Sequence, residues 1–222
     1  MHFFPASDQS ILVYLGEEIG LPAHARVLQL LRTLEHNSPP WLRNLQPAYT
    51  SLMISFDPSL ADHAVVESLV LGCAHSPATT MRKPRTVEIP ACYGGEFGPD
   101  LQEVAALHRL TPTMVIQLHS SQTYRAYFLG FAPGFAYLGD VPDAIATPRL
   151  ETPRKKIPAG SVAIAGKQTA VYPFATPGGW RILGRTPLPM FRQDQKRLSA
   201  ISIGDSVRFK PISTEEFLRM ES

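Results

Sequence analysis

Apolar and polar residues follow two different periods over the first 75 positions of the chain. A short apolar run at 11–16 and an alternating run at 48–58 have the period of a β-strand. Two other segments, 21–36 and 59–74, place apolar residues three and four positions apart, as a helix with one buried face requires. The order strand, helix, strand, helix predicts a small two-layer α/β domain over residues 1–84.

The remainder of the chain has another pattern. Residues 75–85 are polar, basic and contain proline, which is typical of a linker between domains. A strand at 86–92 and a short helix at 100–110, with Asp100 as its N-cap, are expected next. Short apolar runs between Gly and Pro residues then predict strands at 115–119, 124–131, 162–166, 169–173, 180–185 and 206–209. This pattern favours a closed β-barrel over residues 85–222, so the expected fold class is α+β.

Composition narrows the class of protein. Apolar residues make up 44% of the chain and charged residues 18%, as in ordinary soluble globular proteins. The net charge of +2 is too small to favour nucleic acid or an anionic membrane. Two cysteines do not make a disulfide framework, and neither a signal peptide nor a membrane helix is visible. We expect a cytoplasmic protein with no nucleic-acid or membrane partner.

The segment from Pro133 to Pro189 carries the candidate chemistry. It contains nine prolines and seven glycines, interleaved with aromatic residues and arginine, which a hydrophobic core does not need. Between Val141 and Met190 there are seven Lys and Arg residues against two acids. A guanidinium group pairs with carboxylate or phosphate through two hydrogen bonds, so this face favours an anion. Arg154 and Arg185, embedded among turn residues, are the preferred candidates.

Other residues in this region allow two interpretations each. His119 ends an expected strand, where it is either a general base or ligand anchor, or a surface or capping histidine. Tyr137, Tyr172 and Trp180 either pack the barrel or place polar tips at a pocket mouth. The pair at 178–179 either lets the backbone approach a ligand or forms a hairpin turn. No metal-ligand spacing is present, and the segment 160–168 lacks the spacing and hydroxyl residue of a phosphate-binding loop.

Several of these motifs resemble one known family. The segments GFAPGFAYLG at 130–139, TPRLETPRKKIPAGSVAIAG at 147–166 and TPGGWRILGRTP at 176–187 resemble the core of the 5-oxoprolinase B-subunit family. The segment IPACYGGEFGPDLQEVA at 89–105 resembles the part of that family that opens its second domain. The family is also called allophanate hydrolase subunit 1 and includes the Kip-type inhibitors of sporulation histidine kinases.

The resemblance implies a fold, a cofactor and partners. Members of the family have a small N-terminal α/β domain and a C-terminal cyclophilin-like barrel. They act with a larger related protein, the C subunit, which is similar to allophanate hydrolase subunit 2. Together the two subunits use ATP, with Mg²⁺, to activate the lactam of 5-oxoproline, and a separate A subunit completes ring opening to glutamate. We expect the chain to be inactive alone and its ATP site to be shared with the larger subunit.

The resemblance also implies a set of site residues. Arg154 or Arg185 would grip the substrate carboxylate or the transferred phosphoryl group. Gln168 and Ser161 would bind the lactam edge, while His119 would orient or move a proton. The remaining substrate-binding residues implied in this way are Phe131, Pro133, Gly134, Tyr137, Pro158, Tyr172 and Gly178.

Two other functions share these motifs. One is a regulatory protein that docks on a sensor histidine kinase and needs no catalytic geometry. The other is the carboxyltransferase half of a urea carboxylase or allophanate hydrolase system, which requires a biotinylated partner.

Overall fold

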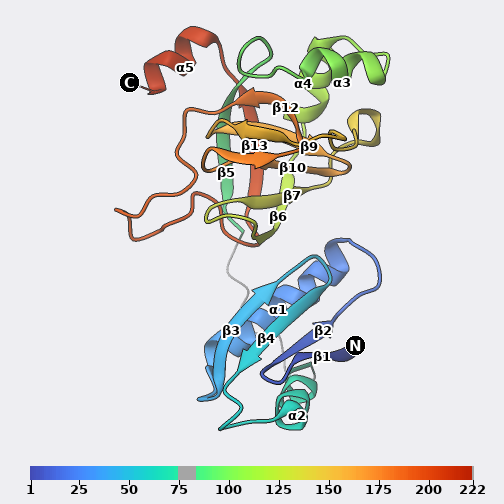
Figure 1. Cartoon of the computed structure of the whole chain (residues 1–222), viewed down its shortest axis with the longest axis vertical. Helices are drawn as coiled ribbons and strands as arrows, with labels where there is room; N and C mark the ends of the chain where they lie inside the picture. Colours follow the sequence, from blue (N-terminus) through green and yellow to red (C-terminus); the bar gives the residue numbers. More distant parts are fainter. Residues whose placement is uncertain (75–83, 222) are drawn as a thin grey trace. The chain divides into compact units, whose positions relative to one another are not determined.

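The computed structural model describes residues 1–74 and 84–221 of the chain. These residues form two compact units, Met1–Lys83 and Pro84–Ser222 (Figure 1). Most of the linker expected at 75–85 lies outside the described residues.

The N-terminal unit is a four-stranded antiparallel sheet with helices packed against it. The strand order is β1 (His2–Ser7), β2 (Ser10–Tyr14), β4 (Ser51–Phe56) and β3 (Leu42–Pro47). Helix α1 (Leu21–Asn37) packs on β3 and β4 and contacts α2 (His63–Ala74). Ile11 pairs with Ile54 and Val13 with Leu52, so four buried side chains share one sheet face. Both predicted helices and both predicted strands are therefore present.

Strands β1 and β3 are not among the predicted elements. Both lie at the edges of the sheet, and most of their residues are exposed or half-buried. An edge strand that buries little apolar surface needs no alternating apolar residues, so its sequence gives no period-two signal.

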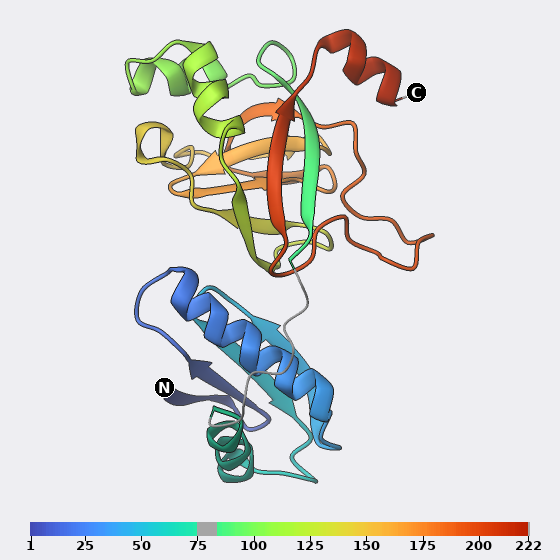
Figure 2. The same cartoon turned by 180° about the vertical axis from the view of Figure 1, so that it is seen from behind.

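The C-terminal unit contains a closed seven-stranded barrel, which confirms the expected architecture. The strand order around the barrel is β10-β7-β6-β13-β5-β12-β9. Strands β5 and β13 run side by side in parallel, while the other pairs are antiparallel (Figure 2). The barrel strands are β5 (Thr86–Tyr93), β6 (Tyr124–Leu129), β7 (Ala136–Gly139), β9 (Ser161–Ala165), β10 (Gln168–Val171), β12 (Arg181–Arg185) and β13 (Ser206–Pro211). A separate two-stranded sheet pairs β8 (Arg154–Ile157) with β11 (Thr176–Gly178).

Two faces of the barrel wall pack into two different clusters. All seven strands contribute to the cluster that fills the barrel, including Val162 and Ile164 of β9. Ala163 and Ala165, which alternate with them, belong to a second cluster with Phe135, Tyr172 and Trp180. This aromatic cluster also contains Ile157 of β8, so it lies beside the small β8–β11 sheet.

The segment 115–119, predicted as a strand, belongs instead to helix α4 (Pro112–Ser120). The Thr111 hydroxyl accepts a hydrogen bond from the Met114 N–H, and proline follows it at the first helical position. These start signals decide the conformation, because a five-residue apolar run has no clear period of its own. The other helices of this unit are α3 (Leu101–Leu107), the 3₁₀ turn η1 (Asp143–Ile145) and α5 (Thr214–Glu221), of which only α3 matches a prediction.

Candidate functional site

A small hollow beside the β8–β11 sheet brings four of the predicted site residues together. Its volume is about 110 Å³. Phe131, Tyr137, Tyr172 and Gly178 were expected there. The other lining residues are Phe135, Arg149, Gly179 and Trp180, and we call this site the aromatic hollow.

Edge-to-face aromatic contacts make the wall of the hollow rigid. The ring centroid of Phe135 lies 5.0 Å from that of Tyr137, 5.3 Å from Tyr172 and 5.6 Å from Trp180. Phe135, Tyr172 and Trp180 are buried, whereas Phe131 stands at the rim with 62% of its surface exposed. Rings that pack edge to face in this way hold one another in place.

The loop between β6 and β7 holds Phe131 at the rim. Phe131 has a φ angle of 68°, in the left-handed region that residues with a side chain seldom adopt. Three backbone hydrogen bonds fix the loop: the N–H groups of residues 130, 132 and 135 donate to the carbonyls of residues 135, 130 and 132. Gly134 has a φ angle of 84°, and a Cβ there would come within 2.9 Å of the Met190 carbonyl oxygen. Gly134 thus supports the loop, and neither Gly134 nor Pro133 is among the lining residues.

Among the residues that the structure describes, Arg149 is the one charged side chain that lines the aromatic hollow. Its guanidinium carbon lies 5.8 Å from the centre of the Trp180 ring, within cation–π range. Within residues 1–74 and 84–221, no carboxylate forms an ion pair with it. The hollow therefore combines aromatic walls with an uncompensated positive charge.

The two tyrosines of the hollow keep their protons at neutral pH. Burial raises the pKa of Tyr172, while a backbone hydrogen bond from Trp180 and the charge of Arg149 act in the opposite direction. Burial also raises the pKa of Tyr137, again opposed by Arg149. Both hydroxyls consequently remain neutral hydrogen-bonding groups beside the ligand space.

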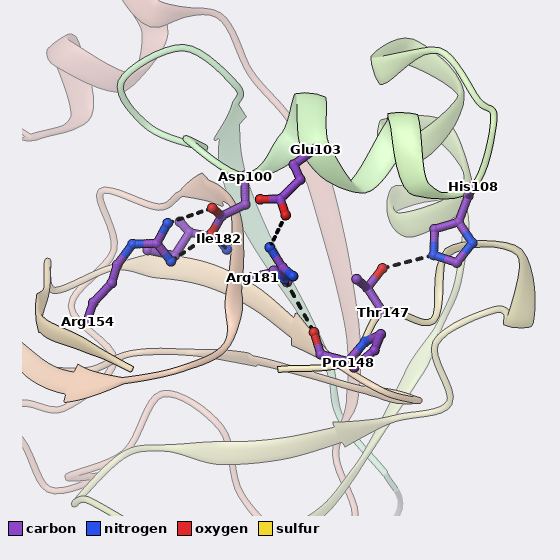
Figure 3. A network of polar contacts seen from close by, with 8 residues as sticks. All are labelled: Asp100, Glu103, His108, Thr147, Pro148, Arg154, Arg181 and Ile182. Atoms are coloured by element: carbon purple, nitrogen blue, oxygen red, sulfur yellow. Dashed lines mark hydrogen bonds and ion pairs between the residues drawn. The ribbon is translucent and has the colours of Figure 1, made fainter. Parts of the chain in front are cut away.

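Arg154 lies close to the hollow but is engaged elsewhere. It stands opposite Gly178 in the β8–β11 pair, yet its guanidinium group turns toward Asp100 (Figure 3). Nη1 donates to Oδ2 at 3.0 Å and Nη2 to Oδ1 at 2.6 Å. Asp100 also accepts the Ile182 N–H at 2.6 Å, so one buried carboxylate ties β8, β12 and the start of α3 together.

Arg185 and Arg181 are likewise held by protein partners. The Arg185 Nε donates to the Ala159 carbonyl at 2.9 Å, and its Nη2 lies 3.4 Å from Glu221 of α5. The Arg181 Nη1 lies 2.6 Å from Glu103 of α3, as Figure 3 shows. Each of these guanidinium groups therefore already has a carboxylate beside it.

His119 is a fully buried member of α4, and the expectation of a strand end was wrong. Its Nδ1 lies 2.8 Å from the Tyr93 hydroxyl and its Nε2 lies 2.9 Å from the Thr169 hydroxyl. The single Thr169 proton goes to the Ala163 carbonyl, so Nε2–H donates to Thr169 and Nδ1 accepts from Tyr93. Burial lowers the pKa of His119 to about 3. The ring is neutral, and both its nitrogens are already bonded.

The other predicted residues lie along the barrel wall and its turns. Gln168 begins β10, where it pairs with Gly139 and Ala165. Ser161 is buried at the start of β9, and Pro158 is exposed in the turn before it. None of the three is among the residues that line the hollow.

Sequence reasoning missed Phe135, did not prefer Arg149 within the basic set, and left a ligand role for Gly179 and Trp180 as one of two interpretations. Arg149 belongs to the basic set that the composition singles out, and Gly179-Trp180 belongs to the motif at 176–187. What distinguishes Arg149 from Arg154, Arg181 and Arg185 is that the others have carboxylate partners from remote parts of the chain. No local pattern carries that information.

The part of the chain that the structure describes offers no metal centre. Residues 1–74 and 84–221 contain no group of three or more His, Cys, Asp or Glu side chains arranged to hold a metal ion. None of the helices in these residues is long and apolar enough to cross a membrane.

Comparison with known proteins shows the domain family to which the chain belongs. Residues 1–201 match the family model described as the carboxyltransferase domain, subdomain C and D. The urea carboxylase of Kluyveromyces lactis has the same fold, with a TM-score of 0.78 and 19% identity over 98% of this chain and 22% of that one.

More similar relatives then define the group within this class. The chain is 40% identical to the 5-oxoprolinase B subunit of Bacillus subtilis over 226 residues, which cover 95% of this chain and 92% of that protein. The crystal structure of TTHA0988 matches with a TM-score of 0.84 and 35% identity over 93% of this chain. The chain spans only 40% of TTHA0988. It belongs to the 5-oxoprolinase B-subunit family of carboxyltransferase C and D domains.

Proposed function

We propose that this chain is the B subunit of a cytoplasmic, ATP-dependent 5-oxoprolinase that converts 5-oxoproline to glutamate. The observation that carries the proposal is the 40% identity to the 5-oxoprolinase B subunit of Bacillus subtilis across 92% of that protein. A protein of this kind implies other subunits. We assign these roles to a larger C subunit, similar to allophanate hydrolase subunit 2, and to a ring-opening A subunit.

The chemistry requires activation of an amide. An unstrained lactam is a poor electrophile, and ATP supplies a phosphoryl group that makes its oxygen a leaving group. Phosphoryl transfer depends mainly on positioning and charge neutralisation. The aromatic hollow supplies groups for both, since it places the Arg149 guanidinium and the Tyr172 hydroxyl beside aromatic rings that pack on one another.

The hollow does not fit ATP itself. Pockets for larger ligands are about 300–1,000 Å³, whereas this one measures about 110 Å³. We therefore place ATP and Mg²⁺ at a site shared with the larger subunit, and this chain alone is expected to be inactive.

Reconstitution tests the proposal directly. Glutamate formation from 5-oxoproline and ATP is measured with all three subunits together and then with this chain omitted. Activity that depends on this chain supports the assignment. A fully assembled complex without turnover refutes it.

A second candidate function is carboxyl transfer. It is favoured by the carboxyltransferase family model and by the fold shared with a urea carboxylase. The same subunits are incubated with urea and a biotin-carrier protein whose carboxybiotin was prepared from labelled bicarbonate, and transfer of the carboxyl group to urea would then give a labelled product and free biotin. Absence of the labelled product removes this candidate.

A further inference from the structure

We infer that Arg149 is the carboxylate anchor of the aromatic hollow, and that the hollow selects small, flat cyclic carboxylates. Naming 5-oxoproline as that ligand rests on the proposed function. The inference itself rests on the charge, position and size of the site.

The charge balance singles out Arg149. Arg154, Arg181 and Arg185 each have a carboxylate within 3.4 Å, at Asp100, Glu103 and Glu221. The fold thus places a carboxylate beside each of these cations. Arg149 contacts an aromatic ring instead, and a cation–π contact leaves the N–H edge of a guanidinium group available for an anion.

The backbone on both sides of Arg149 is fixed. The Pro148 carbonyl accepts a hydrogen bond from Arg181 Nε at 3.3 Å (Figure 3), and the Leu150 N–H donates to the Gly179 carbonyl at 2.7 Å. Both bonds lead to the segment that carries Trp180. Arg149 is therefore held beside the ring that it contacts, and little conformational freedom of its backbone is lost when an anion binds.

The size and shape of the hollow restrict the ligand. A volume of about 110 Å³ equals roughly four water molecules at about 30 Å³ each, which suits a single small ring. Tyr172 and Trp180 line the hollow, and the Tyr172 hydroxyl, which keeps its proton, is a hydrogen-bonding group for a ring carbonyl. An aromatic wall, two tyrosine hydroxyls and one cation together match a cyclic amide that bears a carboxylate.

Titration calorimetry with two related ligands separates the contribution of the charge from that of the ring. 5-Oxoproline and pyrrolidin-2-one share the lactam ring, but only the first carries a carboxylate. Each is titrated into this chain alone and into its complex with the larger subunit. The variants are Arg149→Gln, Arg149→Lys and a matched control, Lys156→Gln, which removes an exposed cation from β8.

We expect Arg149→Gln to weaken 5-oxoproline binding by about 10- to 100-fold, as for loss of a charged hydrogen bond. Its affinity for pyrrolidin-2-one should stay unchanged, Arg149→Lys should be intermediate, and Lys156→Gln should bind like the wild type. Equal affinity of wild type and Arg149→Gln for 5-oxoproline overturns the inference. So does the absence of saturable 5-oxoproline binding both to the chain and to its complex.

The inference and the proposed function fail in different ways. An active complex whose KM for 5-oxoproline is unchanged by Arg149→Gln contradicts the anchor but leaves the oxoprolinase assignment standing. An inactive complex that still binds 5-oxoproline through Arg149 contradicts the assignment and supports the anchor.

Discussion

Replacing Arg154 by alanine should destabilise the barrel rather than remove a substrate contact. The wild-type guanidinium group makes two hydrogen bonds to Asp100, whose side chain is only 4% exposed. In Arg154→Ala, the carboxylate keeps its hydrogen bond from the Ile182 N–H but loses its cation. A buried charge without a partner is costly because the protein interior solvates it poorly.

The size of the effect follows from burial. Breaking a buried ion pair by removing one partner costs about 3–5 kcal/mol. The Arg154 side chain is 30% exposed, so water screens part of the interaction and we expect about 2–3 kcal/mol. At roughly 2–4 °C per kcal/mol for a chain of this size, the melting temperature of the barrel should fall by about 4–12 °C.

Calorimetric melting of the wild type, Arg154→Ala and Lys156→Ala provides the test. Lys156 lies two positions further along β8 and is exposed, so its replacement should change stability by no more than about 0.5 kcal/mol. Glutamate formation by the reconstituted complex is measured below the melting range of both variants. The structural reasoning is refuted when Arg154→Ala melts like Lys156→Ala but loses activity, because Arg154 would then act on the substrate.

Three further predictions concern other parts of the barrel. In the folded protein the pKa of His119 is lowered to about 3, whereas in the unfolded chain it has its ordinary value of 6.5. As the pH falls, the unfolded chain therefore binds a proton at His119 before the folded protein does. The free energy of unfolding should therefore fall as the pH drops from about 6.5 toward 3, by up to about 1.4 kcal/mol per pH unit. Urea unfolding midpoints measured across this range should show this fall in the wild type, and His119→Gln should lack the part that His119 causes. Gly178→Ala should weaken 5-oxoproline binding, because its Cβ would lie 2.6 Å from the Tyr172 hydroxyl oxygen. Gly72→Ala in α2, where an added Cβ meets no atom within 4 Å, should bind like the wild type in calorimetry, and equal affinities of the two variants would contradict this reasoning. Phe217→Ala should destabilise the barrel unit by about 3–5 kcal/mol, because Phe217 is buried against Phe97. It should also make α5 easier to cleave in limited proteolysis, and an unchanged cleavage rate would show that other contacts hold α5.

The architecture was predictable where burial leaves a periodic pattern. Helix α1 buries Val27, Leu31 and Leu34 on one face, and this stripe is legible in the sequence. The barrel was predictable from its short strands and their Gly and Pro boundaries. The edge strands β1 and β3 were not, since they bury little, and α4 was missed because its capping signal at Thr111 was outweighed by an apolar run.

The site was predictable only in part. The rings of Phe131, Tyr137 and Tyr172 were found through the family resemblance, and the structure brings them to one hollow. Charged residues were harder to assign, because the role of an arginine depends on what folds against it. Asp100 is 54 positions from Arg154 in sequence, so their pairing is a property of the tertiary fold.

The abundance of glycine in the segment from Pro133 to Pro189 has a structural cause as well as a functional one. A Cβ at Gly160 would lie 2.3 Å from the Thr186 carbonyl oxygen, and one at Gly184 would lie 2.5 Å from the Cys92 carbonyl oxygen. Neither position lines the hollow, and both allow neighbouring backbone segments of the barrel to approach closely. Gly178 differs, since the atom that excludes a side chain there belongs to Tyr172 of the hollow. Tight packing of the barrel therefore accounts for part of a composition that suggests a ligand site, and we propose that the residues around Arg149 and Trp180 account for the ligand-binding part.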